Sequence, residues 1–347
     1  MVRYYKPFLF IILLWSCCLV PGRAQSPVVL GKATEVAALF KEKANAKTTN
    51  AIGGTKTNVI SHNLPGQIPL ELNLNVSRKE GLADVYSGNV NNLKNSNFFL
   101  KVTGNDLSGL ILLRDQHKAF QYSSGANGLA YLEEVNIDEV VCAEYQAGPV
   151  ASNAASDQPT IAAAVPDLQS LPGAEAVVLL DFDGQYVNSP YWNNGNPINA
   201  APANLTATEM VEVWKLISED YKPFMINITT SEAVYQKAPA NRRLRAIFTP
   251  TNTAAPGSGG VAYISFFTRG NETPCWIFNS GIKGAGDAGS HEIGHTLGLQ
   301  HDGRTSPSES YFLGQSSWAP IMGAGYSKTM VQWSKGEYPA ANNTEDD

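Results

Sequence analysis

Three of the five histidines in the chain lie in one short segment, HEIGHTLGLQH, at positions 291–301. On a helix, His291 and His295 are one turn apart and project from the same face, so both imidazoles can bind a single metal ion. Glu292 lies beside them and can reach a water molecule on the open side of that ion. The spacing therefore predicts a metal site with a carboxylate placed for acid–base chemistry.

Gly298 explains how a third ligand reaches the same ion. A glycine adopts positive φ without strain, so it can end the helix and turn the chain until His301 faces the metal. Three histidines leave one coordination position open, whereas structural zinc sites usually close all four positions, often with cysteine. An open position beside Glu292 is typical of catalysis. The residues predict one catalytic Zn2+, and nothing in the sequence indicates a calcium site.

The pattern HExxHxxGxxH, followed by a turn that contains methionine, resembles the metzincin clan of zinc peptidases. The run WAPIMGAGY places Met322 at the position of the clan's Met-turn, where a thioether packs beneath the histidines. Carried over residue by residue, the resemblance implies that His291, His295 and His301 are the zinc ligands. It also implies that Glu292 is the general base and that Gly298 forms the turn. Met322 is equally interpreted as a gap-filling core side chain, and both interpretations can hold.

Three further features look like the adamalysin or reprolysin branch of this clan: Asp302 after the third histidine, the GVAY strand from Gly260, and the Ile-Met pair. The resemblance covers residues 175–326. It implies an α/β catalytic domain with a twisted, mostly parallel sheet, an active-site helix and a Met-turn, preceded by a mainly β prodomain. It also implies protein or peptide substrates, which we expect to lie extended along residues 261–267.

Tyr326 follows the methionine of this turn at a distance of four residues. A tyrosine near that position donates a hydrogen bond to the developing oxyanion in some metzincins, although theirs lies closer to the methionine. The alternative is a packed aromatic ring with a hydrated hydroxyl group. We keep Tyr326 as an oxyanion candidate.

The N-terminus has the three parts of a signal peptide: basic residues, an apolar run over positions 8–20, and small residues that predict cleavage after Ala24. A transmembrane helix needs about 20 apolar residues, so this run is too short to be an anchor. A lipoprotein attached through Cys17 is the other interpretation, but the bulky Trp15 fits that motif poorly. We therefore predict a secreted, extracellular protein with no transmembrane segment after signal removal.

The 347 residues, 43% hydrophobic and 16% charged, suffice for two ordinary domains. The net charge is only −6 and no block of basic residues is present, which argues against a nucleic-acid partner. Between positions 68 and 144, runs rich in branched and aromatic residues alternate with Gly, Asn and Asp, as in antiparallel strands. Residues 25–145 are therefore predicted to form a β-rich propeptide domain.

Residues 146–173 are rich in Ala, Ser, Pro and Gly and predict a linker, which is either a processing region or an ordinary connection. After the linker the pattern changes to one of alternating strands and helices, and residues 174–347 are the predicted peptidase domain. It contains a buried strand at 175–183 and an amphipathic helix at 206–224 that begins with a Thr206/Glu209 capping box. Its last residues resemble the start of a helix, so we expect a C-terminal helix beyond this sequence.

Signal removal leaves two cysteines, Cys142 and Cys275. Cys142 stands just before the linker, where matrix metalloproteinases keep a cysteine in the fourth zinc position until the propeptide leaves. Its neighbours, VVCAEY, do not match the signature of that family. A zinc-bound thiolate, a disulfide with Cys275 and a buried thiol are therefore three open interpretations. A latent precursor is expected on the broader ground that metzincins commonly carry a propeptide.

Two other functions compete with the secreted zinc endopeptidase. In a gluzincin, a glutamate on a second helix replaces the third histidine, and His301 together with Met322 argues against that class. A zinc-binding but inactive secreted adhesion or binding module is the alternative outside the enzymes. The intact Glu292 disfavours it, because a binding module has no need of a general base.

Overall fold

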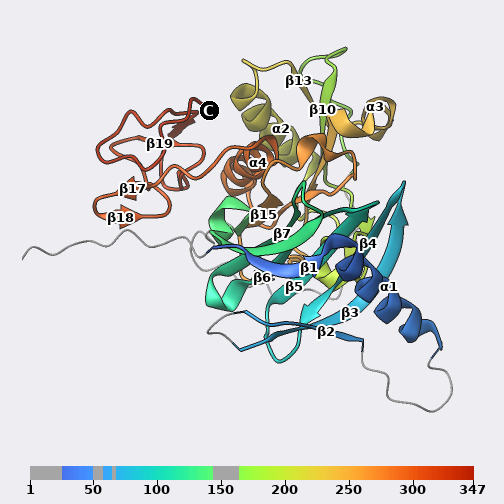
Figure 1. The fold of residues 1–347 in the computed structure, drawn as a ribbon. Helices are drawn as coiled ribbons and strands as arrows, with labels where there is room; N and C mark the ends of the chain where they lie inside the picture. Colours follow the sequence, from blue (N-terminus) through green and yellow to red (C-terminus); the bar gives the residue numbers. More distant parts are fainter. Residues whose placement is uncertain (1–25, 50–57, 65–67, 144–163) are drawn as a thin grey trace, which may run out of the picture.

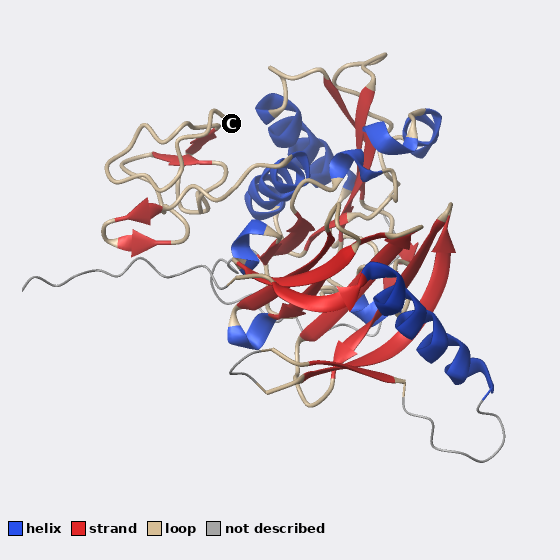
Figure 2. Ribbon diagram, in the orientation of Figure 1, coloured by secondary structure: helices blue, strands red, loops and turns tan. Residues whose placement is uncertain are grey.

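The computed structural model describes residues 26–49, 58–64, 68–143 and 164–347. The predicted signal peptide at 1–24 and most of the predicted linker lie outside these residues. Strands outnumber α-helices in the described part, as Figure 2 shows.

The largest element is an antiparallel sheet of eight strands in the order β1-β8-β7-β6-β5-β4-β3-β2. It forms because its sequence alternates: in β3, Leu70, Leu72 and Leu74 are buried while their neighbours are more exposed. Its strands are β1 (Val28–Lys32), β2 (Val59–His62), β3 (Leu70–Glu80), β4 (Ala83–Val90), β5 (Ser96–Thr103), β6 (Asp106–Leu113), β7 (Lys118–Ser124) and β8 (Leu129–Val135).

Helix α1 (Ala33–Thr49) packs against one face of this sheet (Figure 1). Its Val36 and Phe40 are buried in a core that the strands complete. Phe40 contacts the rings of Tyr86, Phe98 and Tyr122 at centroid distances of 5.5–6.4 Å. The helix therefore closes the apolar face that the alternating strands would otherwise expose to water.

A second sheet has six strands in the order β13-β10-β14-β16-β15-β9. The pairs among β13, β10, β14 and β16 are parallel, whereas β15 is antiparallel to both β16 and β9. Its members are β9 (Val141–Ala143), β10 (Ala176–Asp181), β13 (Ile226–Thr229), β14 (Arg243–Phe248), β15 (Gly260–Tyr263) and β16 (Cys275–Ile277). Strand β9 enters this sheet directly from the N-terminal part of the chain.

Three helices lie beside the second sheet: α2 (Ala207–Asp220), α3 (Glu232–Lys237) and α4 (Ile282–Leu297). The capping box predicted at the start of α2 is confirmed, because Thr206 and Glu209 bond each other's backbone N–H groups. Met210 and Ile217 of α2 are buried in one core with Ile293 of α4. The two helices pack on each other, which fixes α4 relative to the sheet.

After α4 the chain forms short strand pairs and loops that project beside α4 in Figure 1. The remaining strands are β11 (Gln185–Val187), β12 (Ile198–Ala200), β17 (Arg304–Thr305), β18 (Ser308–Glu309), β19 (Trp318–Pro320) and β20 (Met330–Gln332). The 3-10 helices are η1 (Arg114–Gln116), η2 (Ile137–Glu139), η3 (Asn193–Gly195), η4 (Ala240–Arg242) and η5 (Phe267–Arg269).

The two sheets share a hydrophobic core. Phe99 of β5 meets the rings of Tyr191 and Tyr263 edge-on at 4.7 and 5.7 Å, and Tyr263 stacks on Phe266 at 4.7 Å. At the rim, the Arg78 guanidinium donates to the backbone oxygen of Asn188 at 2.6 Å. The eight-stranded sheet is therefore packed against the part of the chain that carries the histidines.

The predicted α/β fold class is wrong for this chain. Most of its regular structure is β, dominated by the eight-stranded antiparallel sheet, and the described residues contain four α-helices. The prediction took its class from a resemblance that covers residues 175–326 alone. It gave too little weight to the antiparallel strands that the sequence also predicts at residues 68–144, and it did not foresee the short strand pairs that follow α4. The strand expected at 261–267 is also shorter, because it ends at Tyr263.

None of the helices in the described residues is both long and apolar enough to span a bilayer.

Candidate metal centre

Helix α4 carries two of the three predicted ligands, His291 and His295, one turn apart. The helix ends at Leu297, and Gly298 follows with a φ of +121°, a conformation that side-chain-bearing residues rarely adopt. Its N–H donates back to the carbonyls of Gly294 and His295. The predicted helix end is confirmed, and the turn brings His301 back to the other two histidines.

The three histidines meet one cysteine in a buried cluster. One ligand atom from each residue lies within 4.8 Å of the others, and the four residues are Cys142, His291, His295 and His301. The Cys142 Sγ lies 3.0 Å from His301 Nε2 and 3.8 Å from His291 Nε2. These separations are similar in size to the edges of a tetrahedron with metal bonds of about 2.0–2.3 Å. The cluster can hold a metal ion.

Hydrogen bonds on the outer side of the rings fix which nitrogen carries the proton. His291 Nδ1 lies 2.8 Å from the Ile321 carbonyl oxygen, and His295 Nδ1 lies 2.8 Å from that of Leu299. A carbonyl only accepts, so each Nδ1 donates and each Nε2 of a neutral ring keeps a lone pair. The two Nε2 atoms are only 2.9 Å apart. Two lone pairs repel at that distance, whereas a cation bound to both converts the repulsion into attraction.

Burial keeps these imidazoles neutral. Desolvation lowers the pKa of His291 to about 4 and that of His301 to about 3. It also lowers the pKa of His295 well below its ordinary value, with His291 and His301 adding to the shift. Neutral imidazole is the form that binds a metal. The donor set of three imidazole nitrogens and one sulfur suits zinc among the common metals.

Cys142 reaches the cluster on strand β9. The strand pairs antiparallel with β15, with Cys142 opposite Ala262, and this pairing occupies the edge of β15 that faces away from β16. Neither Cys142 nor Cys275 forms a disulfide. Of the three interpretations open from the sequence, the disulfide is therefore wrong, and the sulfur lies at the predicted metal site.

Glu292 is fully buried and lies against the start of β15. A Cβ atom placed on Gly260 would come within 2.5 Å of the Glu292 Oε1 and 3.0 Å of its Cδ. Glycine at position 260 thus leaves the space that the carboxylate fills. The acid–base candidate, the strand β15 and the segment that covers this strand are consequently direct neighbours.

Met322 lies against helix α4. Its side chain is fully buried, and its Sδ would be 2.9 Å from a Cβ placed on Gly294, between the two histidines of α4. The backbone beside it holds two other parts of the site. The Ile321 carbonyl bonds His291, and the Met322 carbonyl accepts from the N–H of Asp302 at 2.9 Å.

The tyrosine on the histidine cluster is Tyr311, which sequence reasoning missed. Its ring centroid lies 4.2 Å from that of His301 and 6.1 Å from that of His291, and its hydroxyl lies 3.7 Å from the Cys142 Sγ. Tyr326, the residue chosen from the sequence, is half-buried in the segment that follows Met322 along the chain. Its oxyanion role stays a prediction.

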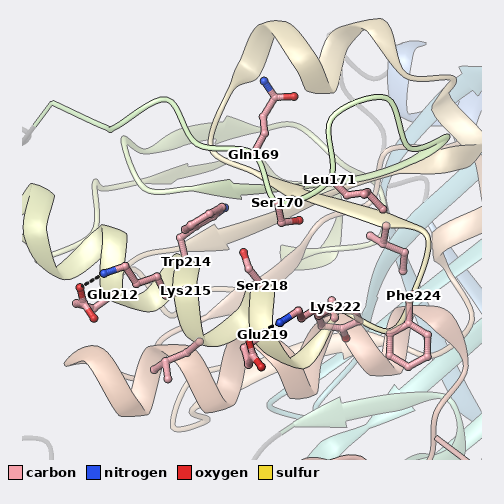
Figure 3. Close-up of a pocket in the computed structure, with 13 residues that line it drawn as sticks. Gln169, Ser170, Leu171, Glu212, Trp214, Lys215, Ser218, Glu219, Lys222 and Phe224 are labelled. Carbon is pink, nitrogen blue, oxygen red and sulfur yellow. Dashed lines mark hydrogen bonds and ion pairs between the residues drawn. The ribbon is translucent and has the colours of Figure 1, made fainter.

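Two pockets differ in their relation to the cluster. One of about 770 Å³ is lined by His301 and Arg304 and by Asp138 and Glu139 of η2, so the N-terminal part of the chain helps to close it. The other, of about 620 Å³, lies along α2 (Figure 3). There Lys215 pairs with Glu212 and Lys222 with Glu219, and no cluster residue lines it. The first pocket is therefore the one that adjoins the histidine cluster.

Comparison with known proteins finds similarity in structure and none in sequence. No protein-family model matches the sequence, and no curated protein matches it. Fourteen chains of solved structures match by structure. One is the crystal structure of metalloproteinase-II from Bacteroides fragilis, at 10% identity and a TM-score of 0.23, over 74% of this chain and 85% of that chain.

Proposed function

We propose that this chain is the latent precursor of a secreted zinc-dependent endopeptidase. The observation that carries the proposal is the buried cluster of three histidines in which a cysteine from a distant segment takes the fourth position. The likeness of residues 291–301 to the metzincin zinc motif agrees with it. Three ligands come from one short segment, whereas the fourth comes from 149 residues away along the chain.

Zinc at this site would polarise the carbonyl of a peptide bond and lower the pKa of a water molecule to near 7. Glu292 would accept a proton from the attacking water molecule while the oxygen of that water bonds to the carbonyl carbon. Glu292 then delivers the proton to the amide nitrogen as the C–N bond breaks. Its burial against Gly260 holds the carboxylate in one place.

The edge of β15 supports the choice of an extended polypeptide as substrate. An unpaired strand edge offers N–H and C=O groups to a second backbone, and β9 already uses this edge in the structure. A substrate strand and β9 would compete for the same edge. Latency follows from the position of the Cys142 sulfur among the histidines, which keeps the short strand β9 on this edge.

The second candidate is a secreted binding module with a structural zinc. One observation favours it: four protein ligands, one of them sulfur, make a closed set, as structural sites do. On this view Cys142 is a permanent ligand, and removing it opens the site without producing any hydrolysis.

Replacement of Cys142 separates the two candidates. We expect the full-length Cys142→Ala chain to keep about one zinc, by mass spectrometry, and to hydrolyse denatured casein, while the unaltered chain does so far more slowly. A chelator and the added change Glu292→Gln should each abolish the hydrolysis, the latter with zinc retained. A folded, zinc-loaded Cys142→Ala chain without activity would favour the binding module.

A further inference from the structure

Tyr311 contacts both the histidines and the cysteine of the cluster. Its ring lies tilted by 45° against that of His301, with the centroids 4.2 Å apart. Its hydroxyl lies 3.7 Å from the Cys142 Sγ, within hydrogen-bonding range for a sulfur acceptor. The hydroxyl therefore points at the atom that takes the fourth position among the histidines.

The backbone next to Tyr311 is held on both sides of the site. The N–H of Phe312 donates to the Asp302 carbonyl at 2.7 Å, and the Phe312 carbonyl accepts from Ala324 at 3.1 Å. Phe312 is itself buried and stacks on Tyr338 at 4.3 Å. These bonds tie the tyrosine to the residue that follows the third histidine and to the turn that contains Met322. These backbone bonds do not involve β9.

The Cys142 sulfur marks the volume that a substrate must enter. Once β9 has left, the oxygen of the scissile carbonyl has to approach the three Nε2 atoms where Sγ now lies. Oxygen is smaller than sulfur, and hydroxyl-to-oxygen hydrogen bonds are about 2.7–2.8 Å long. A hydroxyl already directed at this volume from a fixed backbone needs only a small side-chain adjustment to reach that oxygen.

We propose that Tyr311 donates a hydrogen bond to the oxyanion that develops on the scissile carbonyl, an inference that rests on the proposed peptidase function. The proton stays on the tyrosine oxygen, and no covalent bond to Tyr311 forms or breaks. Charge grows on the carbonyl oxygen as the water attacks, so the hydrogen bond strengthens at that moment and lowers the barrier. In the latent chain the same hydroxyl lies within hydrogen-bonding distance of the Cys142 sulfur instead.

The test uses Tyr311→Phe in the full-length Cys142→Ala chain, with Tyr186→Phe as the matched control because Tyr186 is 61% exposed. We expect kcat to fall by about 10²–10³, as when one oxyanion donor is removed, with little change in KM. Calorimetry should show a comparable loss of affinity for a phosphinic peptide, which carries a tetrahedral anionic centre. Tyr326→Phe, measured in parallel, tests the other tyrosine.

A second measurement needs no activity. In the cobalt-loaded latent chain, which retains Cys142, Tyr311→Phe should shift the sulfur-to-cobalt charge-transfer absorption, while Tyr186→Phe leaves it unchanged. Unaltered kcat and phosphinic-peptide affinity in Tyr311→Phe would overturn the proposal, as would a loss found in Tyr326→Phe instead. If the zinc-loaded Cys142→Ala chain hydrolyses nothing, the peptidase function itself fails, and the cobalt spectrum still reports whether Tyr311 touches the sulfur.

Discussion

Two regions of this molecule bury histidine, and they do so for different reasons. In the eight-stranded sheet, His62 lies among Phe40 and Tyr122, and its Nε2 is 2.6 Å from the Tyr122 hydroxyl. In α4 and the following turn, three imidazoles turn their nitrogens toward one another and toward a sulfur. Burial lowers the pKa of both His62 and His291 to about 4. The pKa shift is thus the same, and only the convergence of donor atoms distinguishes the metal site.

The largest expected difference between the two regions is in metal binding. We expect His295→Ala to lower zinc affinity by more than the 10- to 100-fold typical of losing an outer partner of a ligand, because it removes a ligand itself. His62→Gln, which keeps a hydrogen bond for Tyr122, should leave zinc affinity unchanged. Competition with a fluorescent chelator measures both values. Equal affinities in the two variants would contradict the assignment of the site.

Acidification should destabilise the eight-stranded sheet through His62. Its folded pKa of about 4 lies below its ordinary value of 6.5, so the unfolded chain binds more protons between these two pH values. Stability is then highest above pH 6.5 and falls on acidification to about pH 4, by at most about 3 kcal/mol from this residue. Urea unfolding at pH 7 and pH 4.5 should show a smaller loss for His62→Gln than for the unaltered chain. The same loss in both would show that other groups cause it.

Two glycines sharpen the comparison of the regions. A Cβ on Gly109 in the sheet would lie 2.2 Å from the backbone oxygen of Phe99, whereas one on Gly260 meets the Glu292 side chain. We expect Gly109→Ala to destabilise the fold by about 1–3 kcal/mol, because backbone must move. Gly260→Ala should cost less stability and instead reduce hydrolysis in the Cys142→Ala chain. Thermal unfolding and casein hydrolysis of both variants check this contrast.

The smallest effect is expected at Met322. Leucine has nearly the same volume, so Met322→Leu should change the free energy of unfolding by less than about 1.5 kcal/mol and leave zinc bound. A methionine that only fills space in a core tolerates such a substitution. Loss of zinc from a stably folded Met322→Leu chain would instead assign the thioether a direct part in holding the histidines.

Local sequence patterns predicted the convergence of the three histidines better than they predicted the fold class. The positions of the three histidines, Glu292 and Gly298 could be predicted from the sequence, because helical spacing and one glycine fix their geometry within eleven residues. The strands of the N-terminal sheet and the cap of α2 could be predicted in the same way, from local sequence patterns. Such patterns are short in range and repeat along the element that they describe.

Contacts between residues far apart along the chain could not be predicted from such patterns. Cys142 stayed one of three interpretations, because its histidine partners lie 149 and 159 residues away along the chain. Tyr311 was missed, because the loop that carries it has no hydrophobic periodicity and is placed by bonds to Asp302 and Ala324. The fold class was wrong because it was taken from a likeness confined to the C-terminal half, whereas the largest sheet lies in the N-terminal half.

In the proposed precursor, the attachment of β9 would determine how the site opens. Cys142 is tethered from its N-terminal side, through η2, to a sheet that shares a core with β15. Severing the chain beyond Ala143 leaves this tether whole, so the effective concentration of the sulfur at the histidines stays far above that of small thiols in solution. Such a cut only makes departure permanent once it happens. The lifetime of the severed complex, set by how fast the two halves dissociate, then determines how long the site stays closed.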